Sequence, residues 1–320
     1  MRKKYLYLYI ASAAILAGSC VKTDNGLPDN SIVFSPVASK ATRAIISGAS
    51  YPTTESFVVS AFYNGSYSYF EDLAVSYSSA QSKWTGETDQ YWPLNGSLTF
   101  HAYSPESAVG VSIDASNGIS ASNYTIQTTA QMTTDLCYAT ATVADCSNHP
   151  DAVPLTFSHA LSQVVFRVKA ADYYTTVNNT VTISLTSLSL GGILSVGDFA
   201  DESWDNLSSA RTYTLSNATT ALTYDGENNP QATEVCSYLF LPQELSEDAS
   251  INVGYSVNQS ALGSLSNPPV AIKLKNTITE WQPGKKYIYT LNIGMNNLIT
   301  FSASAVGWLE ENYEIIVEEY

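Results

Sequence analysis

The side chains most often used for acid–base, nucleophilic and metal chemistry are few and scattered in this sequence. The three histidines are His101, His149 and His159. They lack the paired spacing of a metal site, and no Ser-His-Asp arrangement of a hydrolase accompanies them. The segment around Ser195 lacks nucleophile-elbow spacing, and no phosphate-binding glycine loop is present. We therefore expect no enzyme activity, no metal and no cofactor, and we interpret His101 and His159 as polar neighbours within sheets.

Cys20 is the residue whose surroundings indicate a specific modification. A basic stretch, Arg2–Lys4, precedes an apolar stretch, Tyr5–Leu16, in the order typical of a secretory signal peptide. The apolar stretch is too short to span a bilayer, which takes about 20 residues. The small residues before Cys20 resemble the lipobox of bacterial lipoproteins, in which the cysteine is acylated, for example with palmitate. We predict a signal peptide over residues 1–19 and a lipidated leader over 20–30; plain secretion with an incidental cysteine is the alternative.

Three further cysteines, Cys137, Cys146 and Cys236, would reach an oxidising compartment after export. A disulfide between Cys137 and Cys146 would close a small loop and contribute about 2.5–3 kcal/mol. One thiol is left over in any pairing. Buried, unpaired cysteines are the equally acceptable alternative.

The charge balance excludes one class of partner. The chain has 14 basic and 29 acidic residues, a formal net charge of −15, and removal of the signal would make it more negative still. Nucleic acids are bound through Lys and Arg meeting phosphates, so an acidic chain of this kind is not expected to bind them. The length is sufficient for two domains.

Apolar residues recur with a period of two, which predicts β-strands rather than helices. Two Asn-Gly pairs, Asn64–Gly65 and Asn95–Gly96, follow or precede such stretches and indicate tight turns. Many short alternating strands predict an all-β chain of antiparallel β-sandwiches. The polar, proline-bearing segment Asn148–Asp151 interrupts the pattern, so we predict an N-terminal domain over 31–150 and a C-terminal domain over 151–320.

Several short motifs, taken in order, resemble the fimbrillin family of Bacteroidales, and in particular its Mfa-like branch of pilus subunits. The resemblance covers essentially the whole chain. The motifs that carry it are Cys20, Thr42–Ala44, Tyr91–Pro93, Leu98–Tyr103, Asp135–Ala139, Leu155–Ser162, Pro283–Leu291 and Trp308. The family usually has another apolar residue where this chain has Cys137.

The resemblance implies a subunit of a surface filament with two transthyretin-like, Greek-key β-sandwich domains. Family members travel as lipoproteins to the outer membrane, where a trypsin-like protease cuts after an arginine in the loop that follows the first strand. That position matches Arg43, with Ala44 as the new N-terminus and Lys40 as a weaker alternative. Removal of the first strand opens a groove for a strand of a neighbouring subunit, generally from its C-terminal part.

Elementary physics favours the same mechanism. A sheet that lacks a strand exposes backbone N–H and C=O groups and an apolar slot, and an incoming strand satisfies both. We expect the displaced strand to bury Ile32, Phe34 and Val37, at about 1.5–3 kcal/mol for each side chain. Between Arg43 and Arg167 the only basic residue is Lys83, so a trypsin-like protease has few competing sites.

Two alternatives stay open. The end of the chain, Asn312–Tyr320, is either a strand given to a neighbour, as in a shaft subunit, or the last strand of its own sheet, as suits a tip subunit. The chain is also compatible with a non-polymerising surface lipoprotein that binds a glycan or host ligand through Trp84, Tyr91 or Trp92. The expected partners are related pilus subunits, the maturation protease, the outer membrane through its lipid anchor, and a receptor on a host or bacterial surface.

Overall fold

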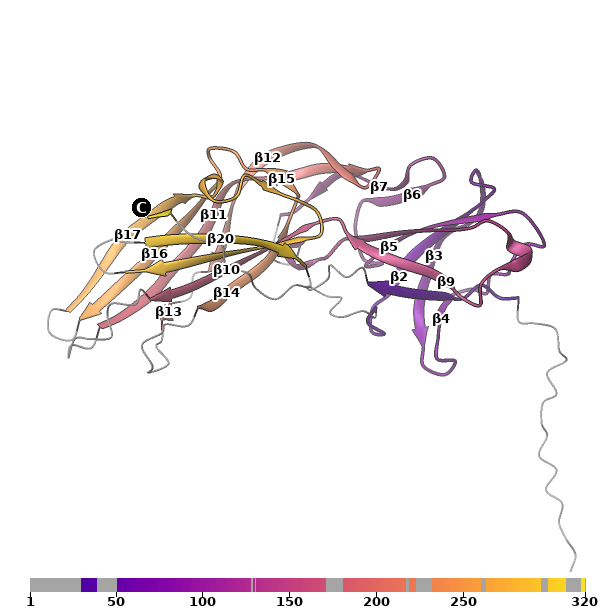
Figure 1. Cartoon of the computed structure of the whole chain (residues 1–320), viewed down its shortest axis with the longest axis horizontal. Helices are drawn as coiled ribbons and strands as arrows, with labels where there is room; N and C mark the ends of the chain where they lie inside the picture. Colours follow the sequence, from indigo (N-terminus) through magenta and orange to yellow (C-terminus); the bar gives the residue numbers. More distant parts are fainter. Residues whose placement is uncertain are drawn as a thin grey trace, which may run out of the picture. The chain divides into compact units, whose positions relative to one another are not determined.

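The N-terminal strands close into a barrel (Figure 1). The structure, a computed structural model, describes residues 30–38, 51–127, 129, 131–170, 181–216, 219–222, 232–259, 263–294, 299–308 and 318–319. Around the barrel the strands follow in the order β1 (Phe34–Ala38), β4 (Lys83–Gly86), β3 (Tyr67–Ser78), β2 (Phe57–Tyr63), β5 (Leu98–Ser104), β8 (Cys137–Val143) and β9 (Val153–His159). Neighbours are antiparallel, except that β1 runs parallel to β9.

The alternation in the sequence accounts for the barrel core. Leu98, Phe100 and Ala102 in β5 are all fully buried, as the period of two requires for one face of a strand. Between β2 and β3, Asn64 and Gly65 take φ values of 50° and 71°. The predicted Asn-Gly turn is therefore present, because both residues adopt the left-handed backbone that this turn needs.

The remaining strands form further sheets. A five-stranded sheet has the order β14 (Thr233–Phe240), β10 (Ser162–Ala170), β19 (Lys285–Ile293), β20 (Ile299–Gly307) and β21 (Glu318–Glu319). A larger sheet has the order β17 (Gly263–Lys273), β16 (Ser250–Gln259), β11 (Val181–Ala200), β7 (Gly118–Thr125) and β6 (Val111–Asp114), with β12 (Ser203–Ser216) and β13 (Thr220–Ala221) also paired to β11. The short strands β15 (Gln243–Glu244) and β18 (Glu280–Trp281) pair with each other.

The all-β prediction is confirmed. The described residues contain no α-helix, and their helical turns are the short 3₁₀ segments Gln131–Thr133 (η1), Cys146–Asn148 (η2) and Leu274–Asn276 (η4). One hydrophobic core contains residues of both the five-stranded sheet and the larger sheet. Among its members are Phe166, Tyr289 and Phe301. The ring of Tyr289 stacks on both phenylalanines, with centroids 5.3 Å away in each case.

The strands do not change sheets at the predicted seam. The polar segment Asn148–Asp151 connects β8 to β9 within the barrel, and β9 pairs with both β8 and β1. The hairpin of β6 and β7, although earlier in the chain, pairs with β11 of the larger sheet. The passage from barrel to sandwich strands falls instead between His159 and Ser162, so the polar segment is a loop within the barrel and not a linker.

The C-terminal end of the chain lies at the edge of its own five-stranded sheet. Glu318 and Glu319 pair antiparallel with Phe301 and Thr300 of β20. The preceding residues 309–317 are outside the described residues. The described end is thus the last strand of its own sheet, and it is only two residues long.

Gly192 provides a test of the larger sheet. It lies in β11 at a φ of +73°, where the pairing with β12 shifts register between Leu190 and Ile193, and a Cβ at this position would collide with the backbone of Asp248. Gly110 has a φ of +78° with open space around it, so Gly110→Ala is the matched control. We expect Gly110→Ala to lose about 1–2 kcal/mol of unfolding free energy from backbone strain. Gly192→Ala should lose about 1–3 kcal/mol more because of the collision. Denaturant unfolding measures both, and equal losses would contradict the tight approach of Asp248.

Candidate functional site

The strand β1 is bound much better along one edge than along the other. It pairs with β9 through five consecutive residues, from Phe34 opposite Val153 to Ala38 opposite Phe157. Its pairing with β4 consists of Phe34 opposite Trp84. Two backbone hydrogen bonds precede and support it: the N–H of Ile32 donates to the carbonyl of Gln90 at 2.7 Å, and the N–H of Val153 to the carbonyl of Val33 at 2.8 Å.

The side chains of β1 and of the residues before it fill the barrel. Ile32 and Phe34 are 4% and 3% exposed, and the ring of Phe34 meets Phe57 and Phe100 edge to face at 5.9 and 6.1 Å. The burial of Ile32 and Phe34 is as predicted. Val37 is only half-buried. The period of two places Pro36, and not Val37, on the same inner face as Ile32 and Phe34.

The predicted cleavage site lies in the sequence between β1 and Tyr51. Arg43, Ala44 and Lys40 lie outside the described residues, as does Cys20. The described chain resumes at Tyr51, which is 3% exposed. The ring of Tyr51 packs at 5.2 Å from both Trp84 and Phe157. The chain on either side of the predicted cut is therefore fixed in the same barrel core, by β1 before it and by Tyr51 after it.

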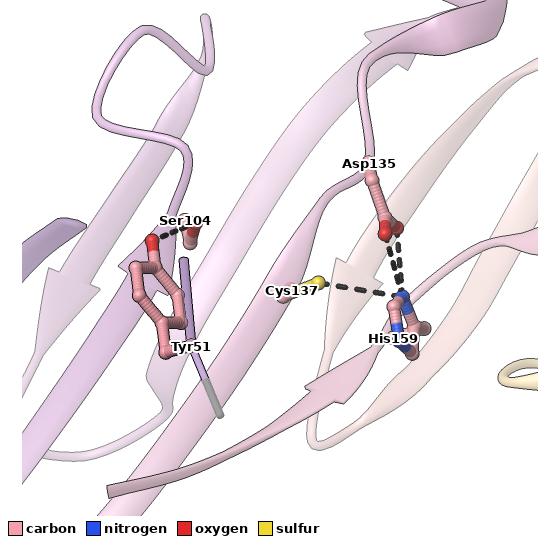
Figure 2. Close-up of polar contacts among 5 residues, drawn as sticks. All are labelled: Tyr51, Ser104, Asp135, Cys137 and His159. Atoms are coloured by element: carbon pink, nitrogen blue, oxygen red, sulfur yellow. Dashed lines mark hydrogen bonds and ion pairs between the residues drawn. The ribbon is translucent and has the colours of Figure 1, made fainter. Parts of the chain in front are cut away.

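The hydroxyl of Tyr51 is held by two hydrogen bonds, of which Figure 2 shows the one with Ser104. It donates to the carbonyl oxygen of Ser56 at 3.1 Å and lies 2.6 Å from Oγ of Ser104 on β5. Burial raises the pKa of Tyr51, because the phenolate would lose its hydration. Tyr51 thus remains a neutral anchor at any physiological pH. No sequence pattern predicts a role for this residue, since it is an isolated tyrosine in a polar stretch.

A second cluster brings together Asp135, Cys137 and His159 (Figure 2). Nδ1 of His159 lies 2.9 Å from Oδ1 and 2.7 Å from Oδ2 of Asp135, and 3.4 Å from Sγ of Cys137. The three residues are 2%, 1% and 3% exposed, and the imidazole stacks on Trp308 with centroids 4.1 Å apart. The prediction that His159 is a polar neighbour within the sheet missed this cluster. The signal that reveals it is the β8–β9 register, which places Cys137 opposite His159.

The cluster has the residue types of a cysteine nucleophile with its base, but not the geometry. In such sites the two partners of the histidine occupy different ring nitrogens. Here the thiol and the carboxylate both lie against Nδ1, and Nε2 is buried without a hydrogen-bond partner. Burial, reinforced by the Asp135 carboxylate, raises the pKa of the Cys137 thiol well above its usual range. A nucleophilic cysteine needs the opposite shift, so the arrangement does not activate the thiol.

The other predicted site residues lie apart from this cluster. His101 is half-buried on β5, with Nδ1 3.0 Å from Oγ1 of Thr140, and burial lowers its pKa. His149 stacks on Trp92 with centroids 4.6 Å apart. Trp92 and Trp84 are buried in the barrel core, whereas Tyr91 is 55% exposed. The three histidines therefore do not form one site.

Of the two alternatives for the cysteines, the structure has the buried, unpaired thiols and not the disulfide between Cys137 and Cys146. Both thiols are free and buried, as is that of Cys236. Cys137 is the first residue of β8, and Cys146 lies in η2, beyond the other end of that strand. A strand of this length separates its ends by about 20 Å. A disulfide needs Cα atoms within about 7 Å, so the two cysteines cannot meet.

Comparison with known proteins identifies relatives of the whole fold. A family model described as fimbrillin-like matches residues 42–308. Among solved structures, a fimbrial protein from Bacteroides vulgatus gives a TM-score of 0.59 at 16% identity and covers 87% of this chain and 99% of that one. Candidate cell adhesion proteins from Bacteroides uniformis and Bacteroides eggerthii each give 0.51, at 14% and 13% identity, with 88% and 89% of this chain and 99% and 98% of theirs covered.

At these identities the structural likeness shows the fold alone. No curated protein matches the chain. In the part of the chain that the structure describes, no helix is long and apolar enough to cross a membrane.

The packing of β1 predicts that the uncleaved protein depends on it for stability. Phe34→Ala should lower the unfolding free energy by about 3–5 kcal/mol, because it removes a buried ring from between Phe57 and Phe100. Ser35→Ala is the control, since Ser35 is exposed on the same strand. Chemical denaturation of the protein with an intact N-terminus measures both. Equal stability of the two variants would show that β1 is not packed as described.

Proposed function

Because the chain belongs to the fimbrillin-like family, we propose that it is a structural subunit of a cell-surface fimbria that supports adhesion. In this proposal it is exported as an outer-membrane lipoprotein acylated at Cys20, cut after Arg43 by a trypsin-like protease, and polymerised by donor-strand exchange. The observation that carries the proposal is β1 itself. It is the first strand of the barrel, it precedes the arginine, and it is paired at length with only one of its neighbours.

Loss of β1 would leave a groove with well-defined requirements. The edge of β9 from Val153 to Phe157 would expose the backbone groups that now pair with β1. The positions of Ile32 and Phe34 would become apolar holes beside Phe57 and Phe100. A donor strand must therefore carry apolar side chains at alternate positions and leave its backbone free to pair with β9. A strand of one subunit that fills the groove of the next makes a head-to-tail contact. Such a contact does not close into a ring, and its repetition builds a filament.

The end of the chain is the simplest source of a donor strand. The two residues of β21 form an edge strand, which is held by few backbone bonds and is exposed to pairing with another chain. A shaft subunit would release this end to its neighbour, whereas a tip subunit would keep it in its own sheet. Before assembly, both a shaft and a tip subunit are expected to have β21 paired with β20 of their own sheet.

A binding lipoprotein that never polymerises is the second candidate function. It is favoured by three exposed tyrosines: Tyr67, Tyr69 and Tyr91 are 71%, 38% and 55% exposed. The Tyr69 hydroxyl donates to the backbone carbonyl of Tyr91 at 2.7 Å, so these two residues lie next to each other. Exposed aromatic faces of this kind suit the stacking of sugar rings. The same surface on a fimbrial subunit would contact a receptor, so the two functions are compatible.

Cleavage after Arg43 is testable with a matched pair of variants. Mass spectrometry of protein from sheared surface filaments should find Ala44 as the N-terminus of the wild type. Arg43→Ala should keep the N-terminal strand, remain in the outer-membrane fraction and form no filaments, because the groove stays filled. Lys40→Ala should mature as the wild type does. Filaments built from Arg43→Ala protein with an uncut N-terminus would rule out the proposed maturation and favour the binding lipoprotein.

A further inference from the structure

Three side-chain heteroatoms surround one ring nitrogen of a buried histidine. Oδ1 and Oδ2 of Asp135 and Sγ of Cys137 all lie between 2.7 and 3.4 Å from Nδ1 of His159, as Figure 2 shows. Nδ1 holds at most one hydrogen, so a proton at this point can be shared with only one of the three atoms in good geometry. The Oδ2 atom of Asp135 is accordingly left without a hydrogen-bond partner, although it is buried. The hydrogen of Nδ1 alone does not satisfy this set of atoms, and the thiol of Cys137 supplies a second one through its hydrogen bond with Asp135.

The charge of the cluster presents the same difficulty. Among the described residues, the one ion pair of Asp135 is with His159, and both side chains are buried, at 1% and 0% exposure. A buried carboxylate is costly unless it is fully paired and hydrogen-bonded. The single hydrogen of Nδ1 meets this requirement incompletely, because Oδ2 lies in the ion pair at 2.7 Å but has no hydrogen-bond partner.

We propose that Asp135, Cys137 and His159 form a three-ligand site for a divalent metal ion of the zinc class. A thiolate, an imidazole nitrogen and a carboxylate oxygen are the three ligand types that Zn²⁺ takes in proteins. Two anionic ligands and a dication give a cluster with no net charge, which removes the burial problem. The site is independent of the proposed function, since strand exchange uses β1 and the metal site does not.

The observed distances are close to those of a tetrahedral zinc site. With Zn–S at about 2.3 Å and Zn–N at about 2.0 Å, tetrahedral geometry puts sulfur and nitrogen about 3.5 Å apart. The separation of Sγ and Nδ1 is 3.4 Å. The carboxylate oxygen is 2.7–2.9 Å from Nδ1 and would need to withdraw by about half an ångström to reach the ligand separation of such a site. All three ligand atoms lie within 4.8 Å of one another.

The fold places the three ligands without any adjustment of the backbone. Cys137 and His159 are opposite each other on β8 and β9, where side chains of paired residues stand side by side. Asp135 comes two residues before Cys137, and the N–H of Ala160 donates to the carbonyl of Leu136 at 2.8 Å, which fixes the two chains at this level. Trp308, fully buried, covers the imidazole. The three ligands leave the fourth position of a tetrahedral site for a water molecule.

Cobalt substitution tests the site in the purified protein. The protein is unfolded, refolded with Co²⁺ and desalted, and its metal content and absorption spectrum are measured. We expect about one equivalent of Co²⁺ per chain, with a thiolate-to-cobalt charge-transfer band and a higher melting temperature than the metal-free protein. Zn²⁺ should displace the band. Retention of no metal by the wild type would overturn the proposal outright.

Matched cysteine variants assign the ligands. Cys137→Ser should abolish the charge-transfer band, and His159→Gln should reduce the retained Co²⁺ by at least about tenfold. Cys146→Ser is the control, because Cys146 is as buried as Cys137 in the same barrel, at 1% exposure each. It should keep both the band and the metal. A band that survives Cys137→Ser would show that another thiol binds the metal and would refute this site. If Cys137→Ser does not fold, Cys146→Ser and Cys236→Ser together decide the question: a band that both keep assigns the thiolate to Cys137, and a band that either loses refutes this site.

Discussion

The barrel depends on a single closing contact, the placement of β1 between β9 and β4. A β-sheet that closes on itself has no exposed edge, and a barrel missing one strand has two. Here the closing strand is the first in the chain, only five residues long, and joined to β4 at one residue pair. The buried residues that it positions, Ile32 and Phe34, belong to the same aromatic core as Phe57 and Phe100. The strand is therefore essential to closure and at the same time joined to one of its two neighbours at a single residue pair.

What would remain after the loss of β1 is still well packed. Tyr51, Phe57, Trp84 and Phe157 contact one another through their rings, and none of them belongs to β1. The Tyr51 hydroxyl adds a hydrogen-bonded tie to β5 through Ser104. The rest of the barrel is thus organised around rings that are independent of the first strand. This division between a replaceable strand and a persistent core is what strand exchange requires.

The sequence reveals those parts of the structure that depend on local patterns. Alternation identifies the strands and the all-β class, and Asn64–Gly65 identifies a turn, because both signals lie within a few residues. The sheets to which β6, β7 and β9 belong are set by pairing between distant segments, which a local pattern does not reveal. For this reason the polar loop at Asn148–Asp151 resembles a domain boundary in the sequence. The cluster of Asp135, Cys137 and His159 was missed for the same reason. Its members meet only once the β8–β9 register is known, whereas Cys137 and Cys146 are close in sequence and far apart along a strand.

Strand β9 belongs to both proposed regions, the groove that β1 fills and the metal site. The two regions use different ends of this strand. From Val153 to Phe157 this strand pairs in parallel with β1, and at Ser158 and His159 it pairs antiparallel with β8. A parallel ladder is slightly weaker per residue than an antiparallel one, and Pro36 supplies no N–H, so β1 is a weak occupant of its slot. The other end of β9 is held by His159, which contacts Asp135, Cys137 and Trp308. The proposed exchange would change the partner of one end of β9 only, while the contacts of His159 hold the other end in place.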